Sequence, residues 1–101
     1  MQLDVTKDGG RVLVKLSGRF DFNTHRGFRS AVEPLLSDAD VSAVIIDFSG
    51  VEYLDSSALG MLLMLRDRMN VAQKEITLTG VLGNVRQVLD IAKFDKLFQI
   101  S

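Results

Sequence analysis

The sequence predicts a single α/β domain, with a mixed sheet of four to five strands and helices packed mainly on one side. Short β-branched runs alternate with apolar patterns of helical period, which implies parallel strand pairing. A chain of 101 residues is long enough for one hydrophobic core but not for two. Its 47% hydrophobic and 25% charged residues are typical of an ordinary globular domain, so we assign residues 1–101 to one unit.

The first two strands are expected to form a β-hairpin. Apolar and polar residues alternate over residues 3–6 and 12–17, and Asp8-Gly9-Gly10 lies between them as a turn. Gly18 is expected to end the second strand. Phe20 and Phe22 follow, and we expect one of these rings in the core and the other exposed.

A first helix is predicted from a cap at Asn23 or Thr24 to about Leu36, with Pro34 kinking it or marking its last turn. Residues 41–48 contain Ala43-Val44-Ile45-Ile46, a continuously apolar run rich in β-branched residues, which is typical of a strand buried on both faces of a sheet. The remaining elements are a helix from Ser56 or Ser57 to about Asn70, a strand at 75–79, a helix after Gly83-Asn84 and a short strand at 97–100.

Composition excludes several classes of function. A formal net charge of −1 without a basic stripe argues against nucleic acid or an anionic membrane as the main partner. The absence of cysteine excludes disulfides, thiolate metal sites and a cysteine nucleophile, and no cofactor or metal is expected. No signal peptide is visible, and the longest apolar run is too short for membrane insertion. These observations indicate a cytoplasmic protein.

The most informative segment is Asp55-Ser56-Ser57, where a buried strand runs into a loop and the loop ends at a helix. A helix N-terminus has unpaired N–H groups and a positive dipole end, so a phosphoryl group on either serine would find favourable donors. The same pattern is also typical of a plain N-cap, which stabilises a helix by about 1 kcal/mol. Local chemistry alone leaves both interpretations open.

Residues further along the same predicted helix suggest a binding surface. Gly60 removes a side chain near the serines, which would let the backbone of a partner approach. Met61, Met64 and Arg68 follow at spacings that place them on one helix face. Methionines there are either core filler or part of an adaptable partner-binding surface.

An enzyme is the least favoured alternative. His25 is the only histidine, and we expect an ordinary surface residue there rather than a general base for a serine. The sequence contains neither a G-x-S-x-G elbow nor a P-loop pattern.

The chain resembles the STAS domain, the fold of anti-sigma factor antagonists and of cytoplasmic modules on sulfate transporters. The matching segments are Leu16-Ser17-Gly18-Arg19-Phe20-Asp21, Val44-Ile45-Ile46-Asp47-Phe48-Ser49 with Val51, Tyr53-Leu54-Asp55-Ser56-Ser57-Ala58-Leu59-Gly60, and Phe94-Asp95-Lys96-Leu97-Phe98. They extend over nearly the whole chain.

The resemblance implies partner switching. The unmodified antagonist would bind an anti-sigma factor that is often a serine kinase, phosphorylation of Ser57 would release it, and a serine phosphatase would restore binding. Ser56 would more often cap the helix, and Asp21, Thr24 and Asp55, together with Ser56 and Gly60, would form the switch surface. A homodimer is a further expected partner. The alternative is a constitutive STAS module of a transporter or scaffold complex, in which the serines only cap the helix.

The chain departs from the family pattern at several positions. Arg19 stands where glutamate is commoner, and Ala58 stands where glycine is frequent. Lys93 stands where a glycine usually follows the third helix, which predicts a left-handed backbone at this residue or its neighbour. The sequence stops at Ser101, before the final helix of many relatives, which would leave an apolar face free for dimerisation or docking.

Overall fold

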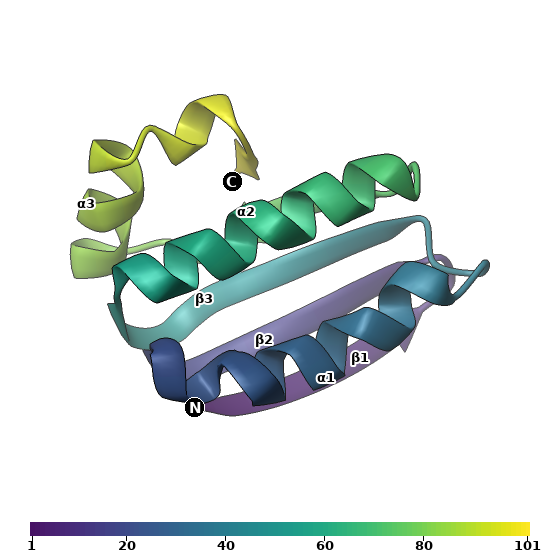
Figure 1. The fold of residues 1–101 in the computed structure, drawn as a ribbon, viewed down its shortest axis with the longest axis horizontal. Helices are drawn as coiled ribbons and strands as arrows, with labels where there is room; N and C mark the ends of the chain where they lie inside the picture. Colours follow the sequence, from purple (N-terminus) through teal and green to yellow (C-terminus); the bar gives the residue numbers. More distant parts are fainter.

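A computed structural model describes residues 1–101 and contains one five-stranded sheet with three α-helices (Figure 1). The strands are β1 (Gln2–Asp8), β2 (Arg11–Phe20), β3 (Ala43–Leu54), β4 (Glu75–Thr79) and β5 (Gln99–Ile100). The α-helices are α1 (His25–Ser37), α2 (Ser56–Val71) and α3 (Gly83–Ile91), and two short 3-10 helices are η1 (Phe22–Thr24) and η2 (Phe94–Lys96). None of the helices is long and apolar enough to cross a membrane.

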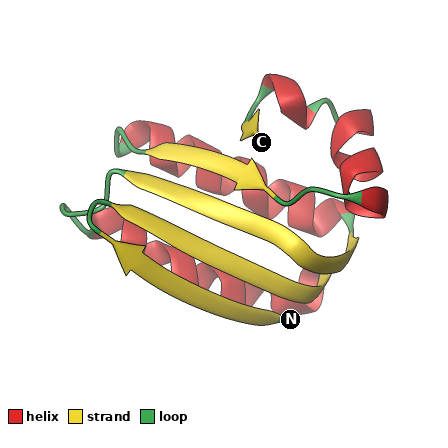
Figure 2. Cartoon of the chain, turned by 180° about the vertical axis from the view of Figure 1, so that it is seen from behind, coloured by secondary structure: helices red, strands yellow, loops and turns green.

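The sheet is mixed, and its strands follow chain order from β1 to β5. The predicted hairpin is confirmed, because β1 pairs antiparallel with β2 and Asp8 lies opposite Arg11. The other neighbouring strands pair in parallel. Seen from behind in Figure 2, α1 and α2 cover one face of the sheet, and α3 lies at the end where β4 finishes. The predicted fold class is therefore confirmed, with helices mainly on one side.

The core lies between the sheet and the two covering helices. All 23 buried residues are hydrophobic, and no polar or charged residue is buried. Val12, Val14 and Leu16 alternate with exposed residues along β2, so one face of this strand points into the core. Phe20 continues that face and is fully buried, whereas Phe22 is 68% exposed. The prediction that one of these rings lies in the core and the other is exposed is confirmed.

Strand β3 differs from the prediction in two respects. Its buried residues alternate with half-exposed ones, so the strand is covered on one face only and not on both. It also continues six residues past the predicted end, through the segment expected to be a loop. The reason is pairing with β2: Ser17 lies opposite Gly50 and Phe20 opposite Leu54, with register shifts on either side of Ser17 and Gly18. Gly18 adopts φ +94° there, and β2 passes through it rather than ending.

The face of the sheet without helices carries several charged residues, with Leu13 exposed among them. Asp4 lies opposite Lys15, Lys15 lies opposite Asp47, and Asp8 lies opposite Arg11 on neighbouring strands. Cross-strand pairs of opposite charge suit a solvated sheet face.

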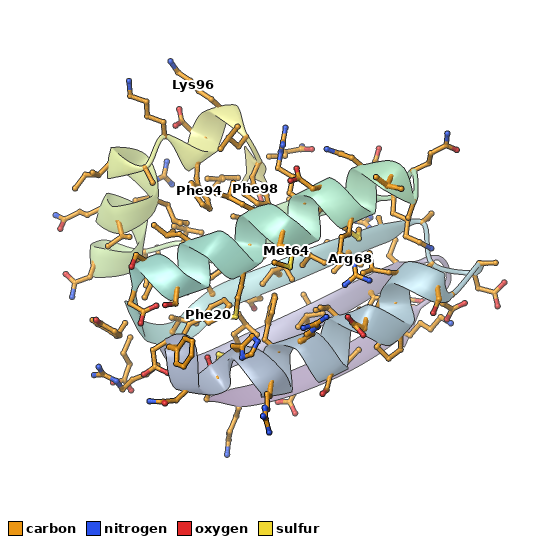
Figure 3. The ribbon with its side chains drawn as sticks, viewed as in Figure 1. Phe20, Met64, Arg68, Phe94, Lys96 and Phe98 are labelled. Carbon is orange, nitrogen blue, oxygen red and sulfur yellow. The ribbon has the colours of Figure 1, made fainter.

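The predicted left-handed residue is Lys93, which has φ 60° and ψ 37° just after α3. The chain turns there into η2, so that the rings of Phe94 and Phe98 stack with centroids 5.2 Å apart (Figure 3). Arg66 on α2 donates to the carbonyl oxygen of Leu97 at 2.6 Å and holds this segment against the helix.

Replacing Lys93 with glycine is expected to stabilise the domain by about 0.5–1 kcal/mol. A left-handed backbone costs a residue with a Cβ about 1–2 kcal/mol, and the greater freedom of glycine in the unfolded chain offsets part of that gain. Urea unfolding followed by circular dichroism measures the change. Lys93→Ala is the control, because it removes the charge but keeps the Cβ, and it should leave stability almost unchanged. A gain equal to that of glycine would contradict the explanation.

Candidate functional site

The site begins at Asp55, the single residue between β3 and α2. Its extended backbone (φ −106°, ψ −179°) makes it the N-cap of α2, and its Oδ1 accepts from the N–H of Ala58 at 2.9 Å. The prediction that Ser56 caps the helix is wrong. Serine and aspartate are both favourable N-cap residues. Here Ser56 is the first residue of the helix, and Asp55, which precedes it, is the residue that caps.

Ser56 and Ser57 form the first turn of α2. Ser56 is exposed and Ser57 is half-buried. The backbone N–H groups of both serines have no acceptor within the chain, because the helix N–H groups that Asp55 accepts are those of Ala58 and Leu59. Unpaired N–H donors at the positive end of a helix favour a negatively charged group.

Asp21 and Thr24 form a second cap beside the first. Asp21 Oδ1 accepts from the N–H of Asn23 at 3.0 Å, and Thr24 Oγ1 accepts from the N–H of Asp21 at 3.2 Å. The N–H of Phe22 donates to Asp55 Oδ2 at 3.4 Å, which joins η1 to the start of α2. Three of the predicted switch residues therefore lie together where β2 and β3 end.

Gly60 lies on the exposed side of α2, one turn after the serines. A Cβ built there would meet nothing within 4 Å, so no packing within this chain requires glycine. Glycine inside a helix is less stable than alanine by about 0.5–1 kcal/mol. The residue therefore reduces stability without an intramolecular benefit.

Replacing Gly60 with alanine is accordingly expected to stabilise the domain by about 0.5–1 kcal/mol. Chemical unfolding of the purified domain checks this value. Gly50→Ala is the contrasting control, because its Cβ would approach the carbonyl oxygen of Leu16 to 3.0 Å and should destabilise the sheet. Destabilisation by Gly60→Ala would contradict this explanation.

The three predicted partner-binding residues lie on the edge of α2 that faces α1. Met61, Met64 and Arg68 line a shallow groove between the helices, and Figure 3 shows Met64 and Arg68 on this side. We call it the α1–α2 groove; its other lining residues are His25, Phe28, Arg29, Val32, Leu36 and Leu65. Its volume of about 80 Å³ is far below that of typical small-molecule pockets, about 300–1,000 Å³.

Glu33 joins the two helices beside the groove. Its Oε1 accepts from Arg68 Nη1 at 2.9 Å and from Arg29 Nε at 3.0 Å. The hydrogen bonds from Arg68 and Arg29 lower the pKa of the Glu33 carboxyl from its ordinary value. This cluster was missed from the sequence, although Arg29 and Glu33 already stand at the i, i+4 spacing of a helical ion pair.

Two further contacts at this end of the sheet involve aromatic rings. The rings of Phe22 and His25 stack with centroids 6.0 Å apart, and His25 makes no hydrogen bond to either serine. The guanidinium of Arg19 lies 4.2 Å from the ring centroid of Tyr53. This cation–π contact gives Arg19 a partner.

Comparison with known proteins agrees with this architecture. The family model described as "Mlab, STAS domain" matches residues 3–99. A STAS-domain containing protein of Pseudomonas aeruginosa is 40% identical over 94 residues, which cover 93% of this chain and 91% of that protein. The anti-sigma F factor antagonist of Paenibacillus polymyxa is 23% identical, with 99% of this chain and 86% of that protein covered.

Solved structures show the same fold. An anti-sigma factor antagonist from Mycobacterium paratuberculosis superposes with a TM-score of 0.86 at 23% identity, covering 98% of this chain and 83% of that one. The Bacillus cell fate determinant SpoIIAA in its phosphorylated form has a TM-score of 0.77 at 16% identity, covering 99% and 91%. The chain belongs to the STAS domain family, and the resemblance inferred from its motifs is confirmed.

Proposed function

We propose that this protein is an anti-sigma factor antagonist that acts by partner switching. In its unphosphorylated form it binds an anti-sigma factor that is also a serine kinase. Phosphorylation of Ser57 releases that partner, and a serine phosphatase restores binding. The protein itself is not an enzyme and works in the cytoplasm.

The observation that carries this proposal is the position of Ser57. It lies in the first turn of α2, half-exposed, and its own N–H and that of Ser56 have no acceptor in the chain. Because Asp55 caps the helix, the hydroxyl of Ser57 is not needed for that purpose. A serine that does not cap the helix and that lies beside unpaired backbone N–H groups is well suited to accept a phosphoryl group.

Ser57 also lies at one end of a candidate contact surface. Met61 follows it by one turn on α2, and Met64 and Arg68 continue the same helix edge. A phosphate adds a charge of roughly −1.5 to −2, so it would change the electrostatics of this edge without disturbing the core. Gly60 would let the backbone of a partner come close, which accounts for a glycine that reduces stability.

The relatives add support of a different kind. One relative is named an anti-sigma F factor antagonist, and a structure of the same fold is described as phosphorylated. An anti-sigma factor is accordingly the partner class we propose.

A labelling experiment tests the modified residue. The purified domain is incubated with ATP and cytosolic extract of the source cells, and the phosphorylated position is mapped by mass spectrometry. Label is expected on Ser57, to be lost in Ser57→Ala and kept in Ser56→Ala. Labelling that is unaffected by Ser57→Ala would overturn the assignment.

A binding experiment tests the consequence. Immobilised Ser57→Ala is expected to retain the kinase from the extract, and Ser57→Asp to retain far less of it. Ser56→Asp is the matched control, because it adds the same charge one residue away on the exposed side of the helix. Equal retention by all three variants would instead favour the constitutive module of a transporter or scaffold complex.

A further inference from the structure

The helical layer of this domain carries charge of the opposite sign to the whole chain. Helices α1 and α2 together hold four arginines and only two carboxylates, whereas the formal net charge of the protein is −1. These charges are Arg26, Arg29, Arg66 and Arg68 against Glu33 and Asp67. Because these two helices carry a net charge of +2, the rest of the chain carries −3, and the surface made by α1 and α2 is basic.

The α1–α2 groove lies in this basic layer and combines an apolar floor with a cationic rim. Phe28, Val32 and Leu65 are buried beneath it, and Met64 is 59% exposed at its surface. A single exposed methionine over an apolar floor offers a flexible contact for an apolar side chain.

Only one carboxylate balances the rim. Both Arg29 and Arg68 bond to Glu33, and their side chains are still 60% and 47% exposed. Each guanidinium has further N–H donors than the bonds to one carboxylate use. The rim therefore keeps donors and positive charge for a second, external carboxylate.

We infer that the α1–α2 groove binds an acidic amphipathic segment of the protein partner, with an apolar side chain over Met64 and a carboxylate at Arg29 and Arg68. The inference rests on the proposed function, because the partner is the one that phosphorylation releases. It also supplies a cause for release. A phosphate on Ser57, one turn before Met61, adds negative charge at the end of the same groove and repels an acidic segment.

The occupant follows from charge and size. Segments with basic residues would meet like charge at Arg29 and Arg68, which costs affinity. An anionic membrane is less suited, because the four arginines of this layer are partly engaged: Arg66 bonds to Leu97 and two others share Glu33. An apolar groove between two helices is suited to the apolar stripe of a helical segment.

Two synthetic helical peptides test the occupant. They share one leucine stripe, and their polar faces carry glutamate in one and lysine in the other. The chain has four methionines, and their labelled methyl groups report by NMR. The glutamate peptide is expected to shift Met61 and Met64 and to leave unchanged the buried Met69 and also Met1, which does not line the groove. Equal binding of the lysine peptide, or shifts outside the groove, would overturn the inference.

Charge variants test the rim. Arg68→Gln is expected to lower the affinity for the glutamate peptide about threefold, as loss of one exposed ion pair does. Glu33→Gln is expected to raise it about threefold, because it removes the competing carboxylate. Glu75→Gln is the matched control, since Glu75 is exposed at the start of β4 away from the groove, and it should have no effect. A loss of affinity in Glu33→Gln would contradict the inference.

Two further arms separate the possible failures. If vesicles of phosphatidylglycerol bind the domain and the glutamate peptide does not, the site recognises lipid and the inference is wrong. Ser57→Asp is expected to weaken binding of the glutamate peptide about threefold. If the glutamate peptide binds the groove but Ser57→Asp does not change its affinity, the groove is the binding site and the proposal of electrostatic release is wrong. The labelling of Ser57 is measured independently of every peptide.

Discussion

Replacing Phe20 with alanine is expected to lower the free energy of unfolding by about 3–5 kcal/mol, the range for large-to-small changes in a core. Phe20 is fully buried at the end of β2, and its ring centroid lies 4.9 Å from that of Phe28 and 6.4 Å from that of Phe48. One substitution therefore removes contacts with both α1 and β3. A domain of this size is stable by about 5–15 kcal/mol, so the loss is a large share of the total.

Urea unfolding followed by far-ultraviolet circular dichroism measures this effect, since the chain has no tryptophan. Phe22→Ala is the matched control: the same side chain is removed two residues away, where it is 68% exposed, and the change should stay within about 0.5 kcal/mol. If Phe20→Ala does not fold, Phe20→Leu gives a smaller loss in the same direction. Similar losses for Phe20→Ala and Phe22→Ala would contradict the assignment of Phe20 to the core.

Replacing Asp55 with alanine is expected to cost about 0.5–2 kcal/mol, because α2 loses its cap and the N–H of Phe22 loses an acceptor. Asp55→Asn should cost only a few tenths of a kcal/mol, since asparagine caps as well as aspartate. Ser56→Ala should be nearly neutral, because Ser56 does not cap the helix.

The same unfolding experiment ranks the three variants. A larger loss in Ser56→Ala than in Asp55→Ala would restore the serine as the cap. Asp55→Asn has a second use, because it removes a negative charge near Ser57 while keeping the fold. Any change that it causes in phosphorylation is therefore electrostatic rather than structural.

The sequence predicted best those features that depend on neighbouring residues. Alternation over residues 12–17 and the Gly9-Gly10 turn predicted the hairpin, and the missing glycine after α3 predicted the backbone of Lys93. In these cases the same few residues carry both the signal and the structure.

It failed where distant residues decide the outcome. Ser49-Gly50 looked like the start of a loop, yet pairing of Gly50 with Ser17 keeps the chain in the sheet. For the same reason, the sequence predicted three of the residues that α2 contributes to the α1–α2 groove but not those that α1 contributes. Met61, Met64 and Arg68 share one helix, and their spacing suggested a common face. Glu33 and Arg29 come from another helix, so only the packing of α1 against α2 brings them together.

The continuation of β3 as far as Leu54 has a consequence for the proposed phosphorylation of Ser57. A single residue separates the sheet from α2, and both oxygens of its carboxylate accept hydrogen bonds. Ser57 is therefore fixed on a rigid platform and has no flexible segment to extend into a substrate cleft. A kinase that phosphorylates Ser57 would have to recognise a folded surface, and binding would cost little conformational entropy because this segment is already ordered. A short peptide with the same sequence would lack the folded shape and would be a poor substrate.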